Sequence, residues 1–202
     1  MSELLCVTDR KLCRGDFLER VEALAACRPR GIILREKDLP EQEYKVLAAR
    51  AAVICKARGV NCILHSFVRT ALALDTKALH VPMPVLRRMG EAQRGRFRIL
   101  GASCHSAEEA REAEMLGCTY VTAGHIFATG CKPGLPPRGL EFLRGVCGAV
   151  SIPVYAIGGI GPDSIAAVRA QGAAGACVMS GAMECADPAA YFAAFERAEG
   201  DR

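Results

Sequence analysis

Short apolar runs recur along the whole chain and alternate with longer segments of helical pattern. Eight runs consist almost only of apolar or small residues, at positions 4–9, 31–36, 62–65, 78–82, 99–105, 120–125, 154–159 and 175–181. Such continuous runs are typical of parallel strands, because these are buried on both faces, whereas half-exposed strands alternate apolar and polar residues. The pattern therefore predicts eight buried β-strands.

The segments between the runs repeat apolar residues at helical spacing and carry signals of helix starts. Ser106 precedes one such segment and Glu109 follows three residues later, which is the pattern of an N-terminal cap. Asp187 stands directly before a proline, a common arrangement at a first helical turn. A further helix is expected to be capped by Asp163 or Ser164. Each predicted strand is thus followed by a helical segment.

Eight strand-then-helix units with no linker between them predict a single domain over residues 1–202, folded as a (β/α)8 TIM barrel in the α/β class. The alternative is an open, doubly wound sheet. Polar residues cluster at the carboxyl ends of most predicted strands, and a barrel brings these ends together at one mouth, where barrel active sites lie. These residues are Asp9, Arg35, Glu36, Lys37, His65, Ser103, His105, His125, Gly158, Gly159 and Ser180. We therefore favour the barrel.

Composition excludes several classes of protein. The chain has 202 residues, 51% of them hydrophobic, and a formal net charge of +4. This mild charge, without a basic stripe interleaved with aromatic residues, does not predict nucleic-acid binding, and the five arginines within residues 87–98 are interpreted as a solvated helix and loop. No apolar stretch reaches the roughly 18 residues that span a membrane.

The eleven cysteines are spread singly through apolar runs, and no CxxC pair occurs. This spacing argues against a disulfide framework and against structural zinc. The first residues contain neither a basic segment nor a long apolar one, so no signal peptide is predicted. These features together predict a reduced, cytoplasmic protein in which cysteine serves mainly as a small hydrophobic residue.

Two glycine-containing turns follow the last two predicted strands. Gly158 and Gly159 come after the seventh, and Ser180 and Gly181 after the eighth. Backbone N–H groups at such turns suit a phosphate, and barrels frequently bind phosphate at this place. The alternative is that the glycines only form a tight turn. A dinucleotide site is not predicted, because the GxGxxG spacing is missing.

Cations and histidines supply the other candidate groups. Arg35 and Lys37 alternate at the end of the second run and should share one face, which suits a second anion, although a charged strand end meeting solvent is the alternative. The four histidines, His65, His80, His105 and His125, fall at the ends of four successive strands. None has the helical pair spacing of a zinc motif, so no metal site is predicted. General acid–base catalysis by one of them is favoured over nucleophilic catalysis by Cys104 or Cys131.

Several stretches together resemble the thiamine phosphate synthase / TenI superfamily. They are "LREK", "ILGASCHSAEEAREAE", "YVTAGHIFATGCKPG", "IPVYAIGGI" and "GACVMSG". The resemblance covers essentially the whole chain. It implies a TIM barrel and a ligand of the thiamine pathway.

The resemblance implies two possible enzymes. Thiamine phosphate synthases join a pyrimidine diphosphate to a thiazole phosphate and release pyrophosphate, using magnesium held by carboxylates after strands three and four. In this chain His65-Ser66 stands at the first of these places, and the second, Val81 to Pro84, contains no carboxylate. In addition, Ile33 stands where the Gln-Leu-Arg-Glu-Lys motif of the synthases begins with glutamine. Because magnesium prefers oxygen ligands, no cofactor is predicted, and magnesium is expected only if the chain is a synthase.

TenI proteins are thiazole tautomerases, isomerases that aromatise a thiazole carboxylate phosphate by a proton shift. They carry Gly-His after strand six, as Gly124-His125 does here. The sequence is therefore interpreted as a TenI-like tautomerase that acts on a thiazole phosphate, with His125 as its catalytic proton shuttle. The alternatives are a thiamine phosphate synthase, a transferase, and a non-catalytic regulator of the pathway.

Small barrels of this kind often form dimers, so a homodimer is possible. The resemblance also assigns the residues that bind the substrate. The phosphate-binding residues are Gly158, Gly159, Met179, Ser180 and Gly181. The remaining substrate-binding residues are Arg35, Lys37, Ser103, Thr129, Cys131 and Lys132.

Overall fold

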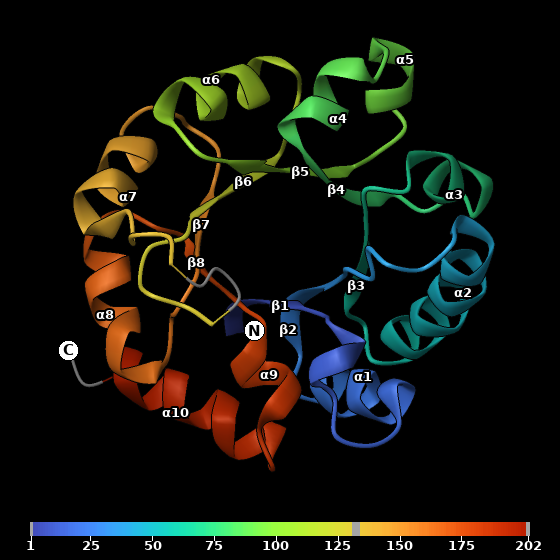
Figure 1. Ribbon diagram of the computed structural model, residues 1–202, viewed down its shortest axis with the longest axis horizontal. Helices are drawn as coiled ribbons and strands as arrows, with labels where there is room; N and C mark the ends of the chain where they lie inside the picture. The colour runs from blue at the N-terminus through green and yellow to red at the C-terminus, as the bar shows by residue number, and fades with distance from the viewer. Residues whose placement is uncertain (1, 131–133, 201–202) are drawn as a thin grey trace.

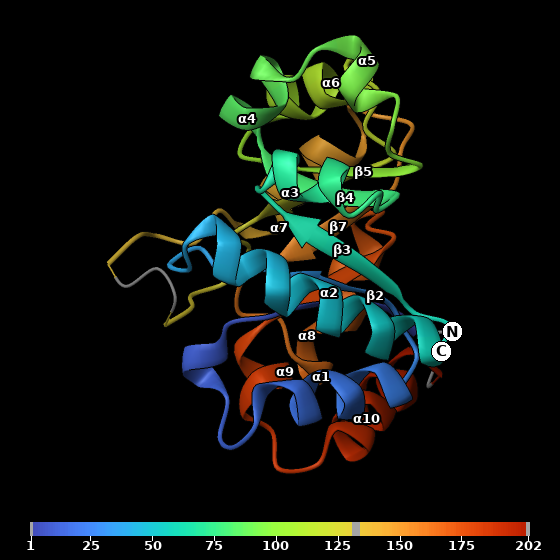
Figure 2. The ribbon, with the colours of Figure 1, turned by 90° about the vertical axis from the view of Figure 1, so that its right-hand side faces the viewer.

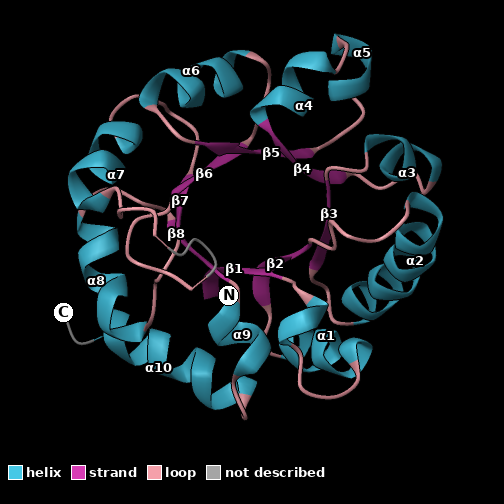
Figure 3. Cartoon of the chain, viewed as in Figure 1, coloured by secondary structure: helices cyan, strands magenta, loops and turns pink. Residues whose placement is uncertain are grey.

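The fold is a closed barrel of eight parallel strands, paired in sequence order, with the eighth strand beside the first. The structure is a computed structural model that describes residues 2–130 and 134–200. Figures 1 and 3 show the ring of strands inside a ring of helices. The strands are β1 (Ser2–Val7), β2 (Pro29–Leu34), β3 (Asn61–His65), β4 (Ala78–Pro82), β5 (Ile99–Cys104), β6 (Tyr120–Gly124), β7 (Val154–Ile157) and β8 (Gly175–Val178).

Helices cover the outside of the barrel between successive strands. They are α1 (Phe17–Ala26), α2 (Glu41–Ala57), α3 (Val68–Ala73), α4 (Met83–Arg88), α5 (Glu91–Arg94), α6 (Ala107–Met115), α7 (Gly139–Cys147), α8 (Pro162–Ala170), α9 (Ser180–Glu184) and α10 (Pro188–Gly200), with a short 3-10 helix at Arg10–Leu12. Within residues 2–130 and 134–200, none of these helices combines the length and the apolar character needed to cross a bilayer. Figure 2 shows the described parts of the loop after β6, residues 125–130 and 134–138, projecting from the barrel end opposite the start of β1.

The prediction of eight strands in a barrel is confirmed, and the open sheet is excluded by the β1–β8 pairing. Most strands end before their apolar runs do, because the last residues of each run turn into the mouth loops. The caps at Ser106 and Asp187 are confirmed: each side chain accepts hydrogen bonds from first-turn N–H groups. The predicted cap at Asp163 or Ser164 is wrong, because Pro162 already starts the helix and leaves Gly161 as the cap residue.

Side chains of each strand alternate between two cores. Leu4 and Cys6 of β1 point outward and pack with helix residues such as Leu24 in the larger cluster. Leu5 and Val7 point inward and belong to the smaller cluster, which fills the barrel interior. The ten cysteines among the described residues are all free.

Tyr44 of α2 reaches between two strands at the mouth. Its hydroxyl donates to the carbonyl oxygen of Leu34 at 2.7 Å and accepts from the backbone N–H of His65 at 2.9 Å. The register pairs Leu34 with Leu64, so these two backbone groups face each other across the strands. A helix side chain therefore bridges β2 and β3 where their ladder ends.

Candidate active site

A cavity of about 530 Å³ opens at the carboxyl ends of the strands. Its apolar floor is the top of the barrel interior and includes Val7, Ile33, Ile157 and Cys177. Polar residues from nearly all of the strand ends surround this floor. A cavity of this volume, apolar below and polar at the rim, has the size and character of a small-molecule site.

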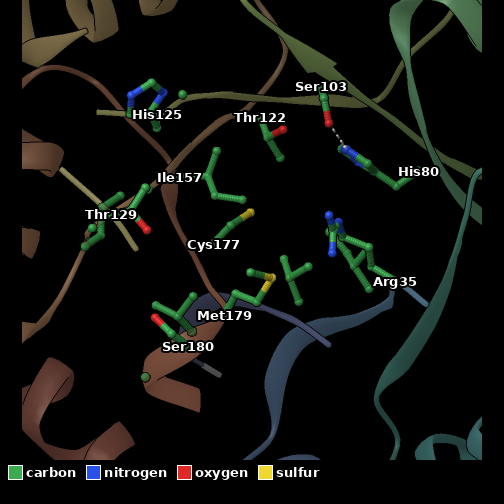
Figure 4. A pocket seen from close by; sticks show the side chains of 18 of the residues that line it. Arg35, His80, Ser103, Thr122, His125, Thr129, Ile157, Cys177, Met179 and Ser180 are labelled. Carbon is green, nitrogen blue, oxygen red and sulfur yellow. Dashed lines mark hydrogen bonds between the residues drawn. The ribbon is translucent and has the colours of Figure 1, made fainter. Parts of the chain in front are cut away.

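The polar residues gather at two ends of the cavity. In Figure 4, Arg35, His80 and Ser103 lie on one side, while Thr129 and Ser180 lie on the other, and Cys177 and Met179 lie between. Gly158, Gly159 and Gly181 also line the cavity. The cavity therefore suits either one ligand that carries polar groups at both of its ends, or two ligands that each carry a polar group.

All five residues predicted to bind phosphate line the cavity: Gly158, Gly159, Met179, Ser180 and Gly181. Gly158 and Gly159 both have positive φ, +104° and +65°. A Cβ at Gly158 would overlap His125, and a Cβ at Gly159 would overlap the carbonyl oxygen of Ala128. Glycine is therefore required here by backbone conformation and by the close approach of the chain after β6, whether or not a phosphate binds.

The structure also brings Arg35, Lys37, Ser103 and Thr129 to the cavity, while Cys131 and Lys132 lie outside the described residues. The predicted division of faces at positions 35–37 is confirmed. Glu36 points away, is only 2% exposed, and accepts a 2.6 Å hydrogen bond from the Thr8 hydroxyl. Arg35 lies 3.8 Å from the carboxylate of Asp9 at the end of β1.

All four histidines line the cavity, in different environments. His65 and His80 are stacked, with ring centroids 5.7 Å apart. Burial lowers the pKa of His65 to about 2, helped by His80 and by the charges of Lys37 and Arg35. Burial and Lys37 lower the pKa of His80 to about 3. Both rings are therefore neutral near pH 7.

His125 lies at the cavity edge, only 6% exposed, and follows a cis peptide bond. Its Nε2 lies 3.3 Å from the carbonyl oxygen of Leu135, and its Nδ1 has no hydrogen-bond partner among the described residues. Arg138 connects the segment before α7 to the end of β5, because its guanidinium donates a hydrogen bond to the carbonyl oxygen of His105 at 2.7 Å. His105 donates through Nδ1 to the carbonyl oxygen of Gly124 at 3.1 Å.

Sequence reasoning missed Tyr120 and Tyr191. The Tyr120 hydroxyl lies 2.9 Å from His80 Nδ1, and His80 Nε2 lies 2.8 Å from the Ser103 hydroxyl. The alternation along β6, which puts Tyr120 on the face of Thr122, was the available signal. Tyr191 of α10 lines the cavity although it lies far along the sequence from the strand ends, and no local sequence pattern predicts this. Cys104 lines the cavity, but burial raises the pKa of its thiol to about 12, which argues against a nucleophilic role.

The donor set of this cavity does not fit magnesium. Mg²⁺ takes hard oxygen ligands and is usually held through one or two carboxylates, yet no Asp or Glu is among the described residues that line the cavity. Nor does any group of three or more His, Cys, Asp and Glu within residues 2–130 and 134–200 form a candidate metal cluster. The nearby cations Arg35 and Lys37 oppose a bound cation further.

The fold and the position of the cavity define a (β/α)8 barrel protein whose site lies at the carboxyl ends of its strands. Residues 4–182 match the family model described as thiamine monophosphate synthase. The chain belongs to this family, as the resemblance of its motifs predicted.

Proteins similar to this chain include thiamine-phosphate synthases. That of Moorella thermoacetica is 40% identical over 195 residues, covering 93% of this chain and 91% of that protein. That of Salinispora arenicola is 38% identical over 205 residues, covering 98% and 97%. Among solved structures, thiamine phosphate pyrophosphorylase from Pyrococcus furiosus has a TM-score of 0.84 and 29% identity, covering 98% of this chain and 96% of that one.

These relatives overturn the interpretation of the chain as a TenI-like tautomerase and isomerase. The relatives at 35–40% identity that span nearly the whole chain are named thiamine-phosphate synthases, which are transferases. The interpretation gave too much weight to Gly124-His125 and to the missing carboxylates, both local features. The role of His125 as a shuttle for the tautomerase proton is withdrawn with it.

Proposed function

We propose that the chain is a thiamine-phosphate synthase, a transferase that joins a pyrimidine diphosphate to a thiazole phosphate and releases pyrophosphate. The observation that carries the proposal is the 40% identity to the Moorella thermoacetica enzyme across nine-tenths of both chains. The cavity supports it, because its two polar ends suit two phosphorylated substrates whose rings meet over the apolar floor.

In this proposal the substrates bind at opposite ends. The thiazole phosphate is held by backbone N–H groups after β7 and β8, at Gly158–Gly159 and Met179–Gly181, with Thr129, Cys131 and Lys132 of the loop after β6. The diphosphate is held by Arg35, Lys37 and Ser103. The reaction forms a carbon–nitrogen bond between the rings and breaks the carbon–oxygen bond to the diphosphate, which leaves with the electron pair.

The chain's contribution is mainly to position the two substrates and to stabilise the leaving group. Holding both rings in one cavity converts a bimolecular reaction into an effectively unimolecular one. Cations beside the diphosphate stabilise the charge that grows as the bond breaks. The proposal includes a cytoplasmic location, supported by thiols such as Cys6 and Cys177 that are packed as buried apolar groups.

A coupling assay tests the proposal. The purified chain is mixed with hydroxymethylpyrimidine diphosphate and thiazole phosphate, and thiamine phosphate is measured after oxidation to its fluorescent thiochrome. We expect product with the unchanged chain, a loss of at least about tenfold for Arg35→Ala, as expected for removing a hydrogen bond to a charged group, and no change for Arg50→Ala, an exposed arginine of α2. Absence of product in every metal condition would refute the proposal.

A further inference from the structure

The end of the cavity assigned to the diphosphate contains cations and neutral donors. Arg35, Lys37, His65, His80 and Ser103 line it. Both histidines are buried and neutral. Arg35 and Lys37 are therefore the charged side chains among the described residues of this lining, and their positive charge favours an anion.

Three acidic side chains close to this end along the chain, Asp9, Glu36 and Asp38, each have a partner of their own. Glu36 accepts hydrogen bonds from the Thr8 hydroxyl at 2.6 Å and from the backbone N–H of Arg10 at 3.1 Å. Asp38 pairs with the guanidinium of Arg10 at 2.6 Å. Asp9 forms a long ion pair of 3.8 Å with Arg35 and accepts a hydrogen bond from the backbone N–H of Lys11, at the end of the cavity wall. None of these carboxylates is among the residues that line the cavity.

A chain of hydrogen bonds with a fixed direction ends at Ser103. Burial raises the pKa of Tyr120, so its hydroxyl keeps its proton. A buried O–H group needs an acceptor, and His80 Nδ1 is the one within hydrogen-bond distance among the described residues, so we infer that Tyr120 donates to Nδ1. A neutral imidazole has a single N–H, which then lies on Nε2 and donates to the Ser103 oxygen at 2.8 Å. The Ser103 proton is left to be donated into the cavity.

We propose that this chain captures the diphosphate directly, through Arg35, Lys37 and the Ser103 hydroxyl, without a bridging divalent cation. The inference rests on the proposed function, since the diphosphate is the leaving group of that reaction. His80 and Tyr120 are positioning residues, which hold Ser103 as a donor toward the anion. Hydrogen bonds from charged and hydroxyl donors to an anion are among the strong ones in proteins, so they replace the metal bridge.

Binding of inorganic pyrophosphate, measured by calorimetry, tests the inference on the unchanged chain. One titration contains EDTA and the other excess magnesium. We expect binding in EDTA that is at least as tight as with magnesium, because magnesium masks the charge of the free anion. Binding that appears only with magnesium would overturn the inference. This comparison requires no variant, so it does not depend on whether an altered chain folds.

The coupling assay in EDTA and in magnesium separates this inference from the proposed function. Product in EDTA supports both. Product with magnesium only leaves the synthase assignment standing and overturns direct capture. Pyrophosphate binding in EDTA without product in either condition supports direct capture and refutes the synthase. Neither binding nor product refutes both.

Two matched tyrosine variants test the positioning role. Tyr120 and Tyr155 lie edge to face inside the barrel, with centroids 5.8 Å apart, but Tyr155 bonds Glu3 at the other end. We expect Tyr120→Phe to weaken pyrophosphate binding about threefold to tenfold and to raise KM for the pyrimidine diphosphate alone. Tyr155→Phe should change neither. Equal rises in both KM values, or none with Tyr120→Phe, would overturn the positioning role.

Discussion

The buried, neutral pair His65 and His80 predicts that the protein loses stability as the pH falls below about 6.5. Burial holds the pKa values of the folded chain at about 2 and about 3, whereas an exposed histidine titrates near 6.5. Between these values the unfolded chain binds more protons than the folded one. Stability is therefore fully present above pH 6.5 and is lost progressively as the pH falls toward 3.

The size of the loss follows from proton linkage. A histidine that stays neutral in the folded chain loses 1.36 kcal/mol of stability for each pH unit well below its unfolded pKa. At pH 5, each ring should contribute a loss of about 2 kcal/mol relative to pH 7 or above, and the pair about 4 kcal/mol. That is a large part of the about 5–15 kcal/mol typical of a folded domain.

Urea unfolding, followed by circular dichroism at pH 7, 6 and 5, measures this loss. The His65→Asn and His80→Asn variants each remove one titrating ring while keeping a polar side chain. Each variant should lose about 2 kcal/mol less than the unchanged chain between pH 7 and 5, and the double variant about 4 kcal/mol less. An unchanged pH dependence in the double variant would show that the two rings are protonated in the folded chain.

Three further substitutions test other parts of the structure. A Cβ at position 101 would overlap the Tyr120 ring. Gly101→Ala should therefore displace that ring and lower the affinity for pyrophosphate by about threefold or more. An unchanged affinity would contradict the packing of that ring. His125→Ala should keep coupling activity within about tenfold, because joining the rings transfers no proton; a loss of a thousandfold would restore a catalytic role. Glu36→Ala leaves the buried Thr8 hydroxyl without its 2.6 Å hydrogen-bond partner and should lower the free energy of unfolding by about 2–3 kcal/mol. A loss below about 0.5 kcal/mol would contradict a stabilising role of this hydrogen bond.

The barrel could be predicted because its signal is repeated eight times. Each strand is a short apolar run and each helix carries an amphipathic pattern, so an error at one boundary does not change the topology. The boundaries of the elements have no such repeated signal. At residues 154–159, for example, the strand ends at Ile157 because Gly158 and Gly159 turn with positive φ, which an apolar run cannot reveal.

The cavity could be predicted only in part. Residues at strand ends, such as Arg35 and Ser103, were found because parallel strands carry their ends to one mouth. The partners of these residues could not be found, because hydrogen-bond direction depends on spatial neighbours. Tyr120 is 40 positions from His80 along the chain, yet bonds it. A single residue such as His125 was also too weak a signal to decide the reaction.

Tyr44 has a consequence for how the mouth could be reshaped. Its hydroxyl is a spacer between β2 and β3, the strands that lead into Arg35 and His65, yet Tyr44 itself is not among the cavity-lining residues. Beyond the last ladder pair, Leu34 with Leu64, the two strand ends are thus joined through a side chain of the outer shell of helices, which contributes to the width of one side of the cavity. A change of substrate size could be reached by substitution at Tyr44, with every residue that touches the ligand left in place.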